Sequence, residues 1–188
     1  MKKMFALFLA LITILSFTAC GSNTEAATEP TTIPTTEPFD VDEYKALVSD
    51  CITEIYDGTV VISNIINFEC KYLKTFQKVS GASKKPSMES VVETGIKGLE
   101  EYSDYTEESV KEQYNNITEM YNTIILSGAD HAEVNEIQTY FTEMYEAYDG
   151  FYNLAFCPEL DLGALATSHD EHTHTIINCN EALKNLLS

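Results

Sequence analysis

The chain has 188 residues and a formal net charge of −19, with 30 acidic residues against 11 basic ones. All the basic residues are lysines, and they are too few to neutralise a nucleic-acid backbone, so we exclude a nucleic-acid partner. The same charge argues against a domain that lies flat on an anionic membrane.

The first twenty residues have the layout of an export signal. Lys2 and Lys3 precede an uncharged apolar run over residues 4–19, and Cys20 follows at once. An uncleaved membrane helix needs about 20 apolar residues. This run is shorter and ends in small and polar residues, as signal peptides do. We therefore predict a signal peptide over residues 1–19.

The end of that segment, Phe17-Thr18-Ala19-Cys20, resembles the cleavage site of the bacterial lipoprotein class, although the class prefers leucine where Phe17 stands. The resemblance implies cleavage before Cys20 and a diacylglyceryl group on its thiol. Two acyl chains anchor a protein stably, where one chain binds only marginally. We therefore expect a membrane partner through Cys20 and a place at the outer face of the cell membrane. Two alternatives remain for this segment: an ordinary secretory signal peptide that is cleaved elsewhere, and a membrane anchor that is retained.

Residues 20–38 are predicted to form a lipidated, disordered linker. They are mostly threonine, glutamate, proline and alanine, and Ile33 is the only large apolar residue. Such a segment cannot bury enough surface to offset the entropy of ordering it. Pro30, Pro34 and Pro38 favour an extended chain, which would hold the following domain away from the membrane.

Residues 39–188 are predicted to be an acidic, all-α domain, because apolar residues recur at alternating spacings of three and four. Strand signals are nearly absent. Four long helices with short connections favour an antiparallel four-helix bundle. We expect the helices over residues 40–79, 87–127 and 131–156, and from between residues 163 and 168 to residue 187.

Two helix starts are predicted from capping patterns. The second helix is expected to bend or break near Ser103, where Asp104 and Glu107 have the spacing of an internal cap. Ser168 and Glu171 have the same spacing near the start of the last helix.

The buried face of the first helix is expected to run from Val41 through Glu69 and Phe76 to Val79. That of the second helix is expected to include Met88, Leu99 and Tyr102.

Four cysteines follow Cys20, an even number that suggests disulfides in an exported protein. At 1.5 Å per residue, Cys51 lies about 17 Å along the bundle and Cys179 about 22 Å, while Cys70 and Cys157 lie at about 45 Å and about 40 Å. Cysteines at a similar distance along the bundle axis are expected to pair, which predicts the disulfides Cys51–Cys179 and Cys70–Cys157. Four buried free thiols are the alternative.

Three of the four histidines lie between residues 169 and 174. His169 and His172 share a helix face, and Glu69 is an unexpected carboxylate on the buried face of the first helix at a similar height. Buried charge persists when it is paired or metal-bound, so these three residues are candidate ligands for a divalent metal such as zinc. The alternative is ordinary capping chemistry at the first turn of a helix, with exposed histidines. Otherwise no cofactor is expected.

Tyr140, Tyr145 and Tyr152 extend the aromatic content of the third helix beyond one buried stripe. They either widen the buried face or form an exposed recognition patch of the kind that tyrosines make at interfaces.

Motifs of catalysis are missing from the sequence: it has no Gly-x-Ser-x-Gly turn and no phosphate-binding loop. We therefore expect a membrane-anchored, non-enzymatic helical module that binds an extracellular protein or a small ligand. A metal-binding lipoprotein that uses the histidines of residues 169–174 is the second hypothesis.

Overall fold

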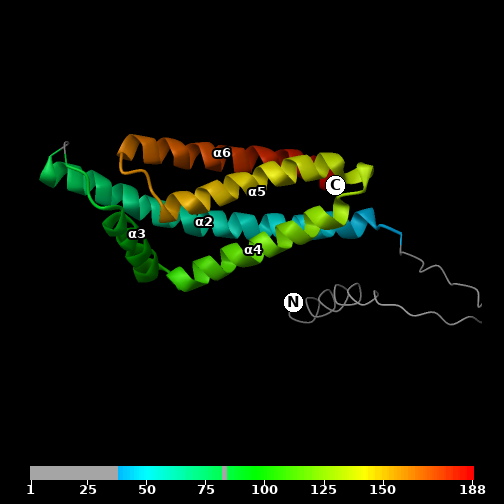
Figure 1. Ribbon diagram of the computed structural model, residues 1–188, viewed down its shortest axis with the longest axis horizontal. Helices are drawn as coiled ribbons and strands as arrows, with labels where there is room; N and C mark the ends of the chain where they lie inside the picture. The colour runs from blue at the N-terminus through cyan, green and yellow to red at the C-terminus, as the bar shows by residue number, and fades with distance from the viewer. Residues whose placement is uncertain (1–37, 82–83) are drawn as a thin grey trace, which may run out of the picture. The chain divides into compact units, whose positions relative to one another are not determined.

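The computed structural model describes residues 38–81 and 84–188, and in this part every regular element is a helix (Figure 1). The predicted signal peptide, Cys20 and the predicted linker up to residue 37 lie outside the described residues. The all-α prediction is confirmed. The helices are α2 (Val41–Ser80), α3 (Met88–Tyr102), α4 (Glu107–Gly128), α5 (Asn135–Phe156) and α6 (Leu162–Leu187), with a short 3-10 helix, η2 (Ala132–Val134).

The region predicted as one helix over residues 87–127 contains two, α3 and α4. The break lies where it was expected, at Ser103, whose backbone is extended. The predicted cap at Asp104 is wrong, because α4 begins after Thr106. The Thr106 hydroxyl accepts from the Ser109 amide at 3.2 Å, and the Ser109 hydroxyl accepts from the Thr106 amide at 2.8 Å. This reciprocal pair satisfies two amides that the helix itself leaves free.

The last helix also begins earlier than predicted. Asp161 caps it by accepting from the Ala164 amide at 3.0 Å, and α6 starts at Leu162. Ser168 and Glu171 therefore do not cap a helix start. The histidines at 169, 172 and 174 stand in the third and fourth turns of α6, so the interpretation of this cluster as first-turn capping chemistry is wrong.

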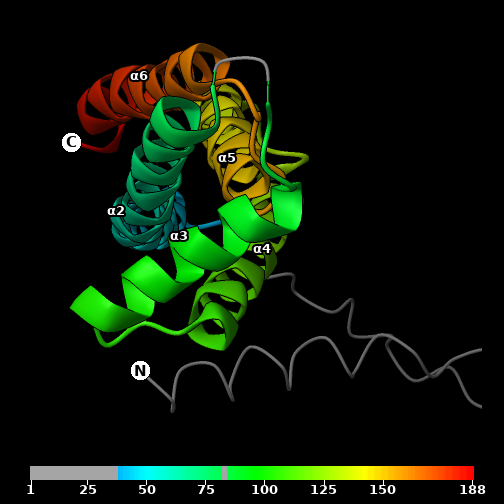
Figure 2. The same cartoon turned by 90° about the vertical axis from the view of Figure 1, so that its left-hand side faces the viewer.

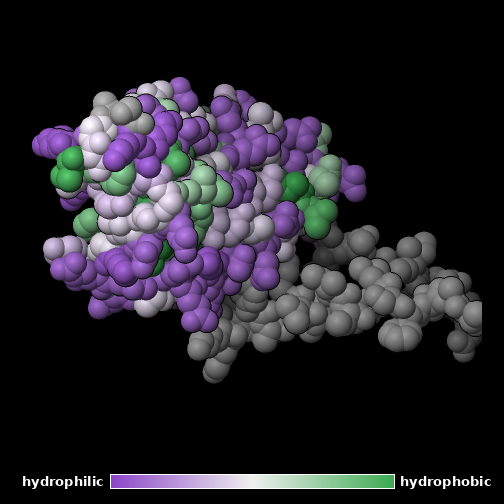
Figure 3. Space-filling view, turned by 60° about the vertical axis from the view of Figure 1, so that its left-hand side comes forward, coloured by the Kyte–Doolittle hydropathy of each residue, from purple (hydrophilic) through white to green (hydrophobic). Residues whose placement is uncertain are grey.

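The longest helix, α2, contacts each of the other four α-helices. The hairpin of α5 and α6 forms the most extensive helix pair and packs along α2 (Figure 1). On another side of α2 lies α4, and α3 crosses α2 obliquely (Figure 2). The surface seen in Figure 3 is mainly hydrophilic, with hydrophobic side chains in small separate groups.

Apolar side chains at helical spacing form one core between the helices. On α2 the buried face follows the prediction from Tyr44 to Glu69. Beyond Glu69 the buried residue is Leu73, whereas the prediction placed the half-buried Tyr72 there. The α2 face then ends, since Val79 is 82% exposed. On α3, Met88 is 42% exposed and Tyr102 is 73% exposed, so all three of these predicted core positions are wrong. Largest among the fully buried side chains are Tyr44, Tyr148, Phe141, Phe151, Ile55, Ile62, Ile65, Ile66, Leu73, Leu99, Ile117 and Met144.

A glycine permits the close approach of α3 to α2. A Cβ atom built on Gly95 would lie 2.8 Å from Cγ of Glu69 and 2.8 Å from Cγ2 of Ile65, and both of these residues are buried. We expect Gly95→Val to lower the free energy of unfolding by about 1–3 kcal/mol, because overpacking forces the two helices apart. Urea unfolding followed by circular dichroism measures the change. Glu100→Val, at an exposed position of the same helix, is the matched control; an equal loss there would contradict the packing explanation.

Candidate functional site

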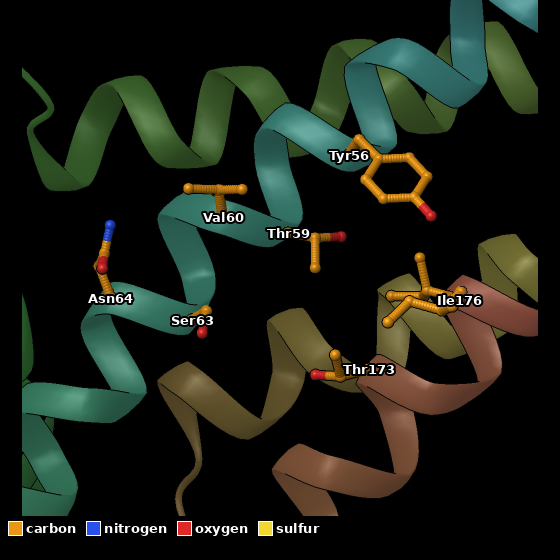
Figure 4. Close-up of a pocket in the computed structure, with 8 residues that line it drawn as sticks. Tyr56, Thr59, Val60, Ser63, Asn64, Thr173 and Ile176 are labelled. Atoms are coloured by element: carbon orange, nitrogen blue, oxygen red, sulfur yellow. The ribbon is translucent and has the colours of Figure 1, made fainter. Parts of the chain in front are cut away.

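A groove lies between α2 and α6. Its volume is about 270 Å³. Figure 4 shows Thr59 and Ser63 of α2 facing Thr173 and Ile176 of α6 across it. The lining residues are Tyr56, Thr59, Val60, Ser63, Asn64, Thr173, Ile176 and Ile177.

The lining follows from helix geometry. The α2 positions are spaced three, four, seven and eight residues from the first, Tyr56, and those on α6 are spaced three and four residues from Thr173. Residues at this spacing share one face of a helix. The groove therefore runs along a face of α2 that lies beside the buried one. The packing of α6 leaves part of this face uncovered.

Uncharged groups dominate the chemistry of the groove. Aliphatic surface comes from Val60, which is 60% exposed, from Ile177, which is 40% exposed, and from Ile176. Hydroxyl groups and the Asn64 amide supply hydrogen-bonding capacity, and the lining contains no carboxylate, lysine or histidine. Such a site favours a neutral, partly apolar molecule.

Ser63 connects the groove to the histidine cluster. Its Oγ lies 3.0 Å from Nε2 of His169, and Nδ1 of His169 lies 3.1 Å from Oδ1 of Asp170. Serine, histidine and aspartate thus form one continuous hydrogen-bonded chain from α2 to α6. The imidazole is packed against the ring of Phe151 on α5, edge to face, with 5.2 Å between centroids.

The three candidate metal ligands do not come together. His169 faces Ser63, and His172 packs closely against Gly150 and near the Phe151 ring. Burial lowers the pKa of His172, which favours its neutral form. Glu69 lies instead beneath Gly95 of α3. Among the described residues, no group of three or more histidine, cysteine or carboxylate side chains is arranged to hold a metal ion.

Glu69 lies apart from the two histidines because its side chain points in a different direction around α2. Glu69 is six residues beyond Ser63, so at 100° per residue its side chain points about 240° around α2 from the one that meets His169. The height estimate placed Glu69 and His169 at similar levels, but level alone does not put side chains on the same side of a helix.

The predicted disulfides are also not formed: Cys51, Cys70, Cys157 and Cys179 are free thiols in the structure. Cys51 and Cys179 are buried, and burial raises their pKa to about 12 and about 11, so both are protonated near neutral pH. Cys70 is half-buried, and Cys157 is exposed, so only two of the four match the alternative of buried thiols. A disulfide requires Cβ atoms about 4 Å apart, which equal height along a bundle does not ensure.

The three candidate tyrosines of α5, Tyr140, Tyr145 and Tyr152, are half-buried and packed within the domain. Tyr145 stacks on Tyr121 of α4 with 3.9 Å between centroids and donates to Thr118 at 3.0 Å. Tyr152 stacks on Tyr114 at 3.8 Å. Tyr140 packs at the edge of the core. Two of the three candidate binding tyrosines therefore direct a ring face to α4, which favours the widened buried face over a free patch.

Sequence reasoning missed Ser63 and the groove. A signal for them existed in the small and hydroxylated residues Thr59, Ser63 and Thr173, which recur at helical spacing beside apolar ones. That signal is weak, because the same pattern is typical of a solvated helix face. Only the packing of α6 on α2 distinguishes the two.

Comparisons with known proteins leave the site to be interpreted from its own geometry. No family model, no curated protein and no solved structure matches the chain. None of the helices in the described ranges combines the length and the apolar character that crossing a membrane requires.

Proposed function

We propose that this protein is a lipoprotein held at the outer face of the cell membrane, whose helical domain binds a small neutral ligand in the α2–α6 groove. The observation that carries the ligand proposal is the groove itself, with Val60 and Ile177 exposed beside uncharged hydrogen-bonding groups. Its volume of about 270 Å³ is just below the range of about 300–1,000 Å³ that is usual for ligand pockets, so the ligand is small.

The membrane part of the proposal is supported by the sequence. Lys2, Lys3, the apolar run and the residues before Cys20 resemble a lipoprotein signal, and the threonine- and proline-rich linker would hold the domain clear of the lipid. We further propose that α2, α4, α5 and α6 correspond to the antiparallel four-helix bundle expected from the sequence, with α3 as an added helix.

The anchor is tested by Cys20→Ser in full-length protein expressed in a bacterial host. We expect the wild type to incorporate labelled palmitate and to partition into the detergent phase of Triton X-114, and the variant to lose both properties, because the acyl chains are attached to that thiol. Cys157→Ser, which removes an exposed thiol of the domain, is the control. An unchanged Cys20→Ser variant would rule out lipidation at this residue.

The ligand site is tested with a library of small uncharged fragments, screened by NMR against the full chain in detergent micelles. We expect chemical-shift changes to cluster on the groove residues and to disappear in Val60→Lys, which places a charge in an apolar site. Val79→Lys is the matched control, because Val79 is an exposed valine of the same helix outside the groove. Fragments that bind elsewhere, or that bind both variants equally, would contradict the proposal.

A further inference from the structure

We propose that Ser63 is a nucleophile for slow acyl transfer from small neutral esters, with His169 as its general base and Asp170 as a positioning residue. The inference rests on the proposed function, because the ester would occupy the same groove. It adds a reaction and a substrate class to that site.

The order of the three groups is the one that activation of a serine requires. A nucleophile must lie within hydrogen-bond reach of a base that is itself oriented by a third group. Here the two contacts are 3.0 Å from Ser63 Oγ to His169 Nε2 and 3.1 Å from His169 Nδ1 to Asp170 Oδ1. With the imidazole proton on Nδ1 donated to Asp170, the lone pair of Nε2 accepts the proton of the Ser63 hydroxyl.

Ser63 differs from the three threonines of α2. Thr53, Thr59 and Thr75 each donate to the carbonyl oxygen four residues earlier, at 3.1, 2.7 and 2.9 Å. This is the usual local bond of a hydroxyl within a helix. The hydroxyl of Ser63 instead meets an imidazole of another helix and also lines the groove. It is therefore placed both for deprotonation and for contact with a bound molecule.

The imidazole is supported by an aromatic ring that does not line the groove. Phe151 is fully buried and its ring meets that of His169 at an interplanar angle of 63°. The His169 side chain is only 20% exposed, whereas Asp170 is 72% exposed. Solvent screens an exposed carboxylate, so Asp170 contributes mainly the orientation and tautomer of the ring.

The reaction balances with an ester and water as the only reactants. Ser63 Oγ attacks the carbonyl carbon and its proton passes to His169 Nε2. The ester C–O bond then breaks, and the leaving alcohol takes the proton from His169. Water attacks the acyl-Ser63 carbonyl with His169 again as base, which releases the carboxylic acid and restores the serine.

The surroundings of Ser63 restrict the substrates to activated esters. The amides of α2 near Ser63 are inside a continuous helix, so they are committed to backbone carbonyls. Thr173 already donates to the carbonyl of His169 at 2.8 Å, which leaves the Asn64 side chain as the amide donor on the groove. Each oxyanion donor contributes about 10²–10³ in rate, so a site with so few donors acts slowly and depends on a good leaving group.

The test uses p-nitrophenyl acetate with the full chain in detergent micelles, following p-nitrophenolate release and mapping the acetyl group by peptide mass spectrometry. We expect acetylation of Ser63, and at least a tenfold loss of the protein-dependent rate in Ser63→Ala and in His169→Gln. His131→Gln is the matched control, since His131 is also paired with a carboxylate, Glu133 at 3.5 Å, whereas the histidine bonded to Ser63 is His169. Its rate should be unchanged.

The role of Asp170 is tested by rescue. Asp170→Asn should slow the reaction several-fold with an unchanged melting temperature, and Asp170→Glu should restore most of the rate, which a purely structural effect would not do. Acetyl groups found only on lysines, or a Ser63→Ala variant with the wild-type rate, would overturn the inference. Adduct mapping on the wild type decides the matter even if a variant fails to fold.

Failure of the reaction and failure of the groove as a ligand site give different results. If neutral fragments bind in the groove and Ser63 remains unacetylated, the inference is overturned and the proposed function stands. When neither binding nor acetylation occurs at the groove, the inference and the ligand-binding part of the proposed function are both overturned. Acetylation of Ser63 at a rate that saturates with ester concentration supports both.

Discussion

We expect the free energy of unfolding of the wild-type protein to decrease as the pH rises, and Glu69→Gln to abolish this decrease. Glu69 is fully buried beneath α3, and neither of its carboxyl oxygens has a hydrogen-bond partner among residues 38–81 and 84–188. Burial raises its pKa to about 9 from an ordinary value of 4.5. An unpaired carboxylate in an apolar site is costly, so the folded protein keeps Glu69 protonated near neutral pH.

The sign follows from the protons bound in each state. Below pH 4.5 Glu69 is protonated in both the folded and the unfolded chain, so it adds no pH dependence. Between pH 4.5 and about 9 the unfolded chain ionises while the folded one does not, so stability falls by about 1.4 kcal/mol per pH unit. At pH 7 we expect Glu69→Gln to be more stable than the wild type by about 3 kcal/mol, and at pH 4.5 the two should be nearly equal.

Urea unfolding followed by circular dichroism at several pH values between 4.5 and 8 measures this difference. Glu54→Gln, on the exposed side of the same helix, is the control and should follow the wild-type curve in parallel. A constant difference between Glu69→Gln and the wild type across this range would mean that Glu69 is ionised in the folded state.

Phe151→Ala should cost about 3–5 kcal/mol, the loss typical of a large aromatic side chain removed from a core. Phe151 is fully buried on α5, where it meets the rings of both His169 and His172 on α6. Its removal leaves a cavity between the two helices that, among the described ones, have the most extensive contact. Thermal and urea unfolding measure the change.

Phe76→Ala is the matched control, because Phe76 is a half-buried phenylalanine near the end of α2 and should lose much less stability. Phe151→Leu keeps most of the volume and should recover most of the loss. Equal effects of Phe151→Ala and Phe76→Ala would show that the α5–α6 contact does not depend on this side chain.

Phe151 also links stability to the proposed chemistry. Its ring supports the imidazole of His169, which in turn meets Ser63 in the groove. The groove itself is formed by α2 and α6, whereas the supporting ring comes from α5. The proposed site therefore depends on three helices that are separated along the chain, and a lipid anchor would present it outside the cell.

The amino-acid sequence alone determined the helical class, most helix bounds and much of the core. Apolar residues at spacings of three and four identified the buried face of α2 from Tyr44 to Ile65, and Ser103 marked the break between α3 and α4. These features are local, because spacing along one helix and the loss of helical backbone at one residue depend on neighbours in the chain. The choice of Thr106 over Asp104 as the cap shows the limit of this reasoning, since several polar residues compete for the same role.

Only the tertiary structure decided which side chains of different helices meet. It placed Ser63 against His169, separated Glu69 from both histidines and left the four thiols unpaired. Sequence spacing gives the height of a residue along a helix, but the rotation of each helix and its crossing angle are set by how whole side-chain surfaces interlock. An error of about 100° in that rotation exchanges one residue for the next, so contacts between distant segments became known only once the helices were packed.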